Sequence, residues 1–143
     1  MNRGPARAGP FVLYWEVELF MGVNRILFIT TTLQTGWAFE QRAAEFLECR
    51  GYAVLDRNFR TRRGEIDIVA KDRDTVVFVE VRARSSVRFG TAAETVGPVK
   101  RARIVHAARM YATLRGLDCP MRFDVIAVSA GKLEHIADAF TAG

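Results

Sequence analysis

The feature that most constrains this chain is a pair of strand-like segments joined by a short polar stretch. Gly64–Ala70 and Val77–Arg82 each alternate polar and apolar residues, the pattern of β-strands with one face buried. Between them, Lys71–Thr75 has the composition of a turn. The sequence therefore predicts a β-hairpin, and we place its tip at Arg73 and Asp74.

This register places two acids opposite each other. Asp67 and Glu80 are equally far from the tip, as are Glu65 and Arg82. Two ionised carboxylates about 5 Å apart repel by roughly 3 kcal/mol at an effective dielectric of 20. Either the two acids lie on a solvated face and tolerate each other, or a cation lies between them. Mg²⁺ and Mn²⁺ suit such a site because they prefer oxygen ligands and are held by only one or two carboxylates plus water and substrate phosphate.

Positive charges surround the predicted acid pair. Arg82 shares a strand face with Glu80, because residues two apart point the same way. A segment just before the hairpin is rich in arginine, and the whole chain carries 21 Lys and Arg against 16 Asp and Glu. A net charge of +5 suits an anionic partner such as nucleic acid. We predict that the following residues contact nucleic acid: Arg57, Arg60, Arg62, Arg63, Arg84, Arg88, Lys100 and Arg101.

The hairpin residues resemble a known family motif. Gly-Glu-Ile-Asp-Ile-Val-Ala followed by Val-Phe-Val-Glu-Val-Arg-Ala-Arg is similar to the central motif of the YraN family, within the restriction-endonuclease-like nucleases that have a PD-(D/E)xK site. The similarity runs from about Gly36 to Val128. Besides the hairpin it includes these segments: Gly36–Leu47 with Glu40, Arg57–Arg60, Phe89-Gly90, Lys100-Arg101 and Arg122–Val125.

The resemblance implies a fold, a site and a substrate class. The implied fold is an α/β, restriction-endonuclease-like three-layer sandwich with a mixed central β-sheet flanked by helices. The implied site has Asp67 and Glu80 as ligands of Mg²⁺ or Mn²⁺, Arg82 at the motif's lysine position, and Glu40 as a further acid, as in archaeal Holliday-junction resolvases. The implied activity is metal-dependent cleavage of structured or branched DNA. A homodimer is compatible with a small nuclease that must cut two strands.

Arg82 departs from the nuclease pattern. A guanidinium stays protonated in proteins, so Arg82 cannot act as a general base. It can orient a phosphate or stabilise developing negative charge, or it can simply pair with Glu65. Three functions therefore stay open: a metal-dependent endonuclease, a nucleic-acid-binding module without hydrolysis, and a protein-interaction domain.

The N-terminal region differs from the rest of the chain. We interpret residues 1–33 as an extension that precedes a later start codon, with a membrane-surface helix as the alternative, and residues 34–143 as the folded domain. No uninterrupted apolar run reaches the roughly 18 residues that a membrane span needs. No secretory signal is apparent. Cys49 and Cys119 form no metal-binding pattern, so we expect reduced cysteines used in packing and a cytoplasmic protein.

Helices and strands are expected around the hairpin. We predict a helix from Trp37 that ends before Gly51, a short strand over Tyr52–Leu55, and a helix from Pro98 to about Arg115. The second helix should bury Ile104, Ala108, Tyr111 and Leu114. Two strands should follow, one over Arg122–Val128 and one from Gly131 through Ile136.

The remaining polar candidates have ordinary alternatives. Ser85–Gly90 is either a loop that closes over a bound strand or a plain connection. Asp124 is either part of the site or an inward carboxylate held by backbone or arginine partners. His106 and His135 are too few and too far apart in the pattern for a zinc site.

Overall fold

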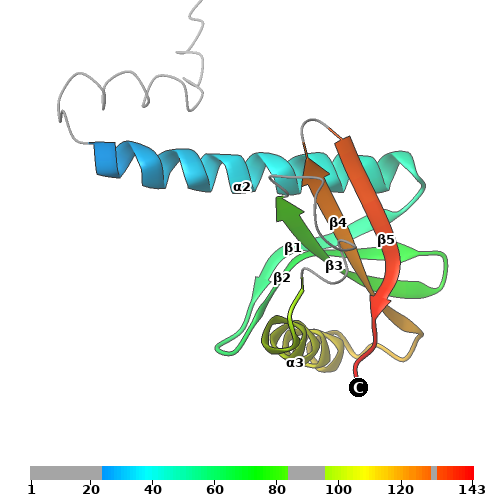
Figure 1. The fold of residues 1–143 in the computed structure, drawn as a ribbon. Helices are drawn as coiled ribbons and strands as arrows, with labels where there is room; N and C mark the ends of the chain where they lie inside the picture. Colours follow the sequence, from blue (N-terminus) through cyan, green and yellow to red (C-terminus); the bar gives the residue numbers. More distant parts are fainter. Residues whose placement is uncertain (1–23, 84–95, 130–131) are drawn as a thin grey trace, which may run out of the picture. The chain divides into compact units, whose positions relative to one another are not determined.

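A computed structural model describes residues 24–83, 96–129 and 132–143 (Figure 1). The chain divides into two units, residues 1–36 and 37–143, and the second contains the sheet. Arg84, Arg88, the Ser85–Gly90 segment and Gly131 lie outside the described residues. The elements in chain order are α2 (Asn24–Cys49), β1 (Ala53–Arg60), β2 (Glu65–Asp72), β3 (Thr75–Ala83), α3 (Pro98–Arg115), β4 (Met121–Ser129) and β5 (Lys132–Phe140).

The five strands form one mixed sheet in the order β1-β2-β3-β4-β5. All neighbours are antiparallel except β3 and β4, which run parallel and are connected through α3. A parallel pair needs such a crossover because its strands cannot be joined by a tight turn. The predicted α/β class, with a mixed sheet flanked by helices, is confirmed. Among the described residues, no helix is both long and apolar enough to cross a membrane.

The β2–β3 hairpin has the predicted register from its tip to Ile68 and Val79, and the ladder ends before the predicted pairs Asp67–Glu80 and Glu65–Arg82. Asp72 pairs with Thr75 and Ile68 pairs with Val79, so the tip lies at Arg73 and Asp74. Arg73 has a φ of 55°, the left-handed conformation that tight hairpin turns use. Because the side-chain period of a strand is two, this register decides which residues reach each face of the sheet.

The C-terminal half of α2 covers one face of the sheet. Ala43, Ala44 and Leu47 are buried against a group from the strands that includes Ile68, Val77, Val79, Ile126 and Val128. The helix ends at Cys49, and Gly51 follows with a φ of 87°, as expected for a glycine after a helix end. The predicted start at Trp37 is wrong, because α2 already begins at Asn24. No proline lies between Asn24 and Trp37, so every residue there can donate the backbone hydrogen bond of a helix.

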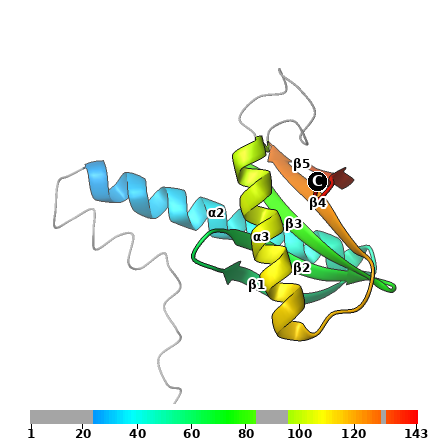
Figure 2. The same cartoon turned by 90° about the horizontal axis from the view of Figure 1, so that it is seen from below.

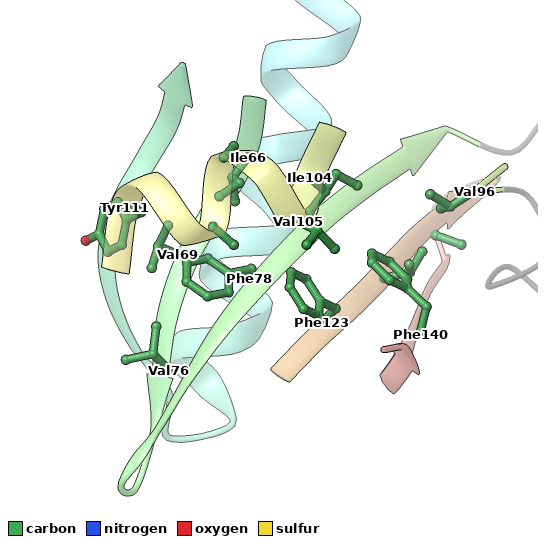
Figure 3. Packing of buried hydrophobic residues seen from close by; sticks show 14 residues of the cluster. Ile66, Val69, Val76, Phe78, Val96, Ile104, Val105, Tyr111, Phe123 and Phe140 are labelled. Atoms are coloured by element: carbon green, nitrogen blue, oxygen red, sulfur yellow. The ribbon is translucent and has the colours of Figure 1, made fainter. Parts of the chain in front are cut away.

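The second helix, α3, has the predicted bounds and covers the opposite face (Figure 2). Ile104, Val105 and Tyr111 pack with Phe78 and Phe123 (Figure 3). The expected burial of Leu114 is wrong, because 68% of that residue is exposed. Leu114 lies in the last turn before Gly116, and the buried stripe of the helix already ends at Tyr111.

The first strand is longer than predicted. We expected a strand over Tyr52–Leu55 followed by a cationic loop, but β1 continues to Arg60. Phe59 pairs with Ile66 and its ring lies 5.0 Å from that of Tyr111, so an inward aromatic residue holds the arginine-rich segment on the sheet. A first strand at the sheet edge can carry several charges on its exposed positions.

The two cysteines are free. Cys119 packs against the α3 side of the core as expected, whereas Cys49 is exposed and contributes little to packing.

Candidate functional site

In strand β2, the regular alternation of side chains between the two faces of the sheet is interrupted at Asp67. Ile66 packs on the α3 side of the sheet and Ile68 on the α2 side, although residues two apart in a regular strand share a face. Opposite this point in β1, Asn58 has a left-handed φ of 54°. The ladder between β2 and β3 ends at Ile68 and Val79. Asp67 therefore lies where the two strands begin to separate.

The Asp67 carboxylate takes the place of a backbone acceptor. Its Oδ2 accepts a hydrogen bond of 2.7 Å from the backbone N–H of Val81. Burial, followed by the negative charge of Glu80, raises the pKa of Asp67 to about 7, and the Val81 N–H opposes both effects. Glu40 on α2 also raises this pKa, so both other acids are within electrostatic reach of Asp67.

Glu80 is the most buried of the three acids Asp67, Glu80 and Glu40, with 3% of the residue exposed. Its Oε1 lies 3.4 Å from Lys100 Nζ and 3.6 Å from Arg82 Nη1. Burial raises the pKa of Glu80, and the charges of Lys100 and Arg82 act in the opposite direction. The second oxygen, Oε2, is buried and accepts no hydrogen bond from an N–H or hydroxyl group of the described residues, whereas the Asp67 carboxyl is within hydrogen-bonding reach of Glu80. Two buried carboxyl groups this close are costly unless they share a proton or a cation.

These four residues form a compact charged group on the β2–β3 strands and the first turn of α3. We call Asp67, Glu80, Arg82 and Lys100 the acid site. The structure brings Asp67 and Glu80 together and confirms that Arg82 is beside Glu80. Lys100, which we expected to face outward towards phosphate, has its ammonium between Glu80 and Glu65, 3.6 Å from Glu65 Oε1. Sequence spacing gave no sign of this, since the contact joins β3 to the helix of the crossover.

The donor set suits a divalent cation held in part by a substrate. Among the described residues there is no group of three or more His, Cys, Asp or Glu side chains placed to hold a metal ion. Asp67 and Glu80 are two carboxylates, the number that commonly holds Mg²⁺ or Mn²⁺ together with water and phosphate. Glu80 Oε2, which accepts no hydrogen bond from an N–H or hydroxyl group of the described residues, supplies a buried oxygen for such an ion. Glu40 is half-buried and acts on Asp67 through its charge.

A basic hollow of about 710 Å³ adjoins the acid site. We call it the basic pocket, and its lining residues are Arg60, Thr61, Arg62, Arg63, Gly64, Glu65, Lys100 and Arg103. Lys100 belongs both to this lining and to the acid site. The sequence predicted Arg60, Arg62, Arg63 and Lys100 as nucleic-acid contacts, and these four lie together. Arg103 also lines the pocket, because α3 packs against the turn before β2.

The turn that lines the basic pocket is fixed by short-range hydrogen bonds. The Thr61 hydroxyl accepts from the backbone N–H groups of Gly64 and Arg63, at 3.0 and 3.2 Å. The Thr61 N–H donates to the Gly64 carbonyl at 2.8 Å. A Cβ at Gly64 would lie 2.1 Å from the backbone carbonyl oxygen of Arg103, so only glycine allows this contact between the turn and α3.

Two other predicted contacts have different surroundings. Arg57 donates to Gln41 Oε1 at 2.6 Å, and its Nε and Nη2 are buried without hydrogen-bond partners in the described part of the chain. Arg101 donates to the Val96 carbonyl at 2.6 Å and lies over the Phe140 ring. Neither residue lines the basic pocket.

Asp124 is a fully buried structural acid. Arg122 donates to both of its oxygens at 2.8 and 3.0 Å, His135 Nε2 lies 2.8 Å away, and the Asp138 N–H donates at 2.9 Å. Burial alone raises the pKa of Asp124, but the His135, Arg122 and Asp138 contacts outweigh it and lower the pKa. This geometry agrees with the alternative of an inward carboxylate held by its neighbours.

Comparison with known proteins assigns the family. The profile of the family described as "Uncharacterised protein family UPF0102" matches residues 39–128, which is more than half of the chain. The chain belongs to the UPF0102 family. This agrees with the YraN-like motif of the hairpin, and the matched range contains the acid site and every residue of the basic pocket.

UPF0102 proteins of several bacteria are similar to this chain. One from Burkholderia thailandensis is 50% identical over 108 residues, covering 75% of each chain. One from Syntrophus aciditrophicus is 46% identical over 117 residues, covering 78% of this chain and 92% of the relative. One from Anaeromyxobacter dehalogenans is 49% identical over 106 residues, covering 71% of this chain and 79% of the relative.

Proposed function

We propose that this UPF0102 protein binds structured or branched DNA in the basic pocket and cleaves its phosphodiester backbone with Mg²⁺ or Mn²⁺ held by Asp67 and Glu80. The observation that carries the proposal is the position of Lys100. Its ammonium lies 3.4 Å from Glu80 and at the same time lines the basic pocket. A phosphate bound in the pocket would therefore be next to the two carboxylates.

The charge of the basic pocket supports an anionic ligand. Among the described residues that line the pocket, five side chains are cationic and one, that of Glu65, is acidic. Phosphate contacts by Lys and Arg supply most of the affinity of non-specific nucleic-acid binding. Arginine also matches phosphate geometry with two parallel hydrogen bonds. The proposal includes a cytoplasmic location, where such a substrate is available.

The acid site supplies the chemical part of the proposal. A bound Mg²⁺ or Mn²⁺ would polarise the scissile phosphate and lower the pKa of an attacking water. Asp67 and Glu80 are the residues that would hold it. Arg82 stays protonated and would steady negative charge on the phosphate. The mixed sheet with a helix on each face agrees with the restriction-endonuclease-like fold that the motif implies.

A second candidate is a nucleic-acid-binding module without hydrolysis. The observation that favours it is that Lys100 and Arg82 already offset the charge of Glu80. With two protein cations beside this carboxylate, the acid site can be stable without a metal ion. This candidate predicts steep salt dependence of binding and no requirement for a divalent cation.

The test is a cleavage and binding assay on linear, flapped and four-way-junction DNA and RNA in Mg²⁺, Mn²⁺ or EDTA. Wild type is compared with Asp67→Asn and with Asp74→Asn, a matched loss of charge at the exposed hairpin tip. Metal-dependent cutting that is lost in Asp67→Asn and kept in Asp74→Asn supports the nuclease. Salt-sensitive binding in EDTA without any cutting supports the second candidate. Binding no stronger than that of other basic proteins of this size contradicts both.

A further inference from the structure

Lys100 lies between the proposed metal ligand Glu80 and the basic pocket proposed to bind phosphate. We propose that the Lys100 ammonium competes with the divalent cation for Glu80, and that phosphate in the basic pocket withdraws Lys100, so that nucleic acid and metal bind cooperatively. This inference rests on the proposed function, because it concerns the same carboxylates and the same pocket.

The first step is that Lys100 is held loosely. Its Nζ lies 3.4 Å from Glu80 Oε1 and 3.6 Å from Glu65 Oε1. Both distances exceed the roughly 2.7–2.9 Å of a well-formed hydrogen bond between an ammonium and a carboxylate. The Lys100 side chain is 30% exposed, whereas that of Glu80 is 4% exposed. The ammonium is therefore accessible from the pocket, whereas the carboxylate that it pairs with is buried.

The second step is that the ammonium and a metal ion exclude each other. Glu80 Oε2 is buried and accepts no hydrogen bond from an N–H or hydroxyl group of the described residues, and Oε1 faces Lys100. A divalent cation on this carboxylate would lie within a few ångströms of the ammonium, where two positive charges repel strongly at low dielectric. The Lys100 ammonium therefore weakens metal binding in the absence of nucleic acid, and its movement away from Glu80 would relieve the repulsion.

The third step is that the basic pocket offers Lys100 another partner. Lys100 lines the pocket beside Arg60, Arg62, Arg63 and Arg103, all of which attract phosphate. Lysine has a flexible four-carbon stem, so its ammonium can move from Glu80 to a phosphate by side-chain rotation alone. That movement frees Glu80 for the metal. By linkage, the metal must then strengthen nucleic-acid binding by the same factor.

The experiment measures Mn²⁺ affinity by the paramagnetic resonance signal of the free ion. The protein is wild type, Lys100→Met or Lys132→Met, each with and without a short DNA duplex whose phosphorothioate backbone resists cleavage. Lys132→Met is the matched control, because it makes the same exchange at an exposed residue of β5 that does not line the basic pocket. Thermal unfolding of each variant checks that it is folded.

We expect DNA to tighten Mn²⁺ binding to wild type by about tenfold, a coupling of typical size. Lys100→Met should bind Mn²⁺ about tenfold tighter than wild type without DNA and should gain little when DNA is added. Lys132→Met should keep the coupling. If Lys100→Met fails to fold, Lys100→Gln, which also removes the ammonium, takes its place, because DNA phosphate that ligates Mn²⁺ directly would by itself produce coupling in wild type.

Other results separate this inference from the proposed function. Equal Mn²⁺ affinity in wild type and Lys100→Met, with DNA having no effect, overturns the competition. If that affinity is still lost in Asp67→Asn, the metal site of the proposed function stands. Absence of Mn²⁺ binding in every variant, with or without DNA, overturns both the inference and the metal-dependent function.

Discussion

Asp67 accepts a hydrogen bond of 2.7 Å from the backbone N–H of Val81 across the point where β2 and β3 separate. A carboxylate here occupies a position that a backbone carbonyl would take in a regular ladder. The strands can then part without leaving the Val81 N–H unpaired, which would be costly for a buried backbone group. The opening that brings Asp67 beside Glu80 is thus stabilised by Asp67 itself.

The raised pKa of Asp67 predicts an unusual pH dependence of stability. Folding raises this pKa from 3.8 to about 7, mainly through burial and also through the charge of Glu80. Between these values the folded protein keeps a proton that the unfolded chain has lost, so this group makes the free energy of unfolding fall as the pH rises.

Asp67→Asn should remove that contribution. Its free energy of unfolding, relative to wild type, should therefore increase from about pH 4 to about pH 7 by roughly 1–3 kcal/mol. Urea unfolding across this pH range measures the difference. For Asp74→Asn, at the exposed hairpin tip, the free energy of unfolding should change with pH as it does for wild type. A constant offset between Asp67→Asn and wild type would show that Asp67 has an ordinary pKa.

Arg82→Lys tests whether the arginine limits cleavage. A lysine can lose its proton and help to activate water, whereas a guanidinium cannot. We expect the rate of metal-dependent cleavage to increase by about 100-fold, the lower end of the range for a gained acid–base group. Arg73→Lys, the same exchange at the exposed hairpin tip, should leave the rate near that of wild type. Equal inactivity of Arg82→Lys and wild type would point to the loss of more than this one group.

Arg62 and Arg63 should contribute to DNA affinity through phosphate contacts. Replacing either by alanine should weaken binding to all DNA sequences alike and reduce the slope of log affinity against log salt by about 0.9 for each lost contact. Fluorescence anisotropy titrations over a range of salt concentrations measure the slope. Lys132→Ala removes an exposed charge from β5 and should leave the slope unchanged. If Arg62→Ala and Arg63→Ala show the same salt slope as Lys132→Ala and wild type, the turn of residues 61–64 does not contact DNA phosphates.

Gly64→Ala should destabilise the fold. The added Cβ would lie 2.1 Å from the backbone carbonyl oxygen of Arg103, and backbone cannot move aside as a flexible side chain can. We expect a loss of about 3 kcal/mol in the free energy of unfolding, the upper part of the usual range for overpacking. Calorimetry or urea unfolding measures this loss.

Gly36→Ala is the matched control for Gly64→Ala. No described atom lies within 4 Å of the position that a Cβ at Gly36 would take, and this glycine is inside α2. Because alanine favours the helix more than glycine does, the exchange should be neutral or stabilising by up to about 1 kcal/mol. Equal stability of the Gly64→Ala variant and wild type would show that the turn and α3 can separate at little cost.

The sequence predicted the parts of this structure that depend on local periodicity. The hairpin register follows from alternating residues and a polar tip, so the proximity of Asp67 and Glu80 could be foreseen. The bounds of α3 follow from Pro98 and from the glycine after Arg115. The length of β1 could not be predicted, because its last residues include Arg57 and Arg60, which have the composition of a loop. Their place in the strand depends on the contact of Phe59 with Tyr111 of α3, which is distant in the sequence.

The contacts of Lys100 lay beyond such reasoning. They require the position of α3 on the sheet, which is set by the packing of Ile104 and Tyr111 rather than by any motif. The same is true of Arg103, which enters the basic pocket through the same packing. For Asp124, sequence left two interpretations open, and its contacts with Arg122 and His135 became visible only in the structure.

The contact between Gly64 and the Arg103 carbonyl joins two walls of the basic pocket through main-chain atoms alone. Main-chain atoms have no rotamers, so the width of the pocket at this point is the same whichever way the arginines turn. A protein of this architecture could therefore change which ligands it accepts by altering side-chain length at residues 62, 63 and 103. Widening the pocket itself would require the helix to be repacked on the sheet.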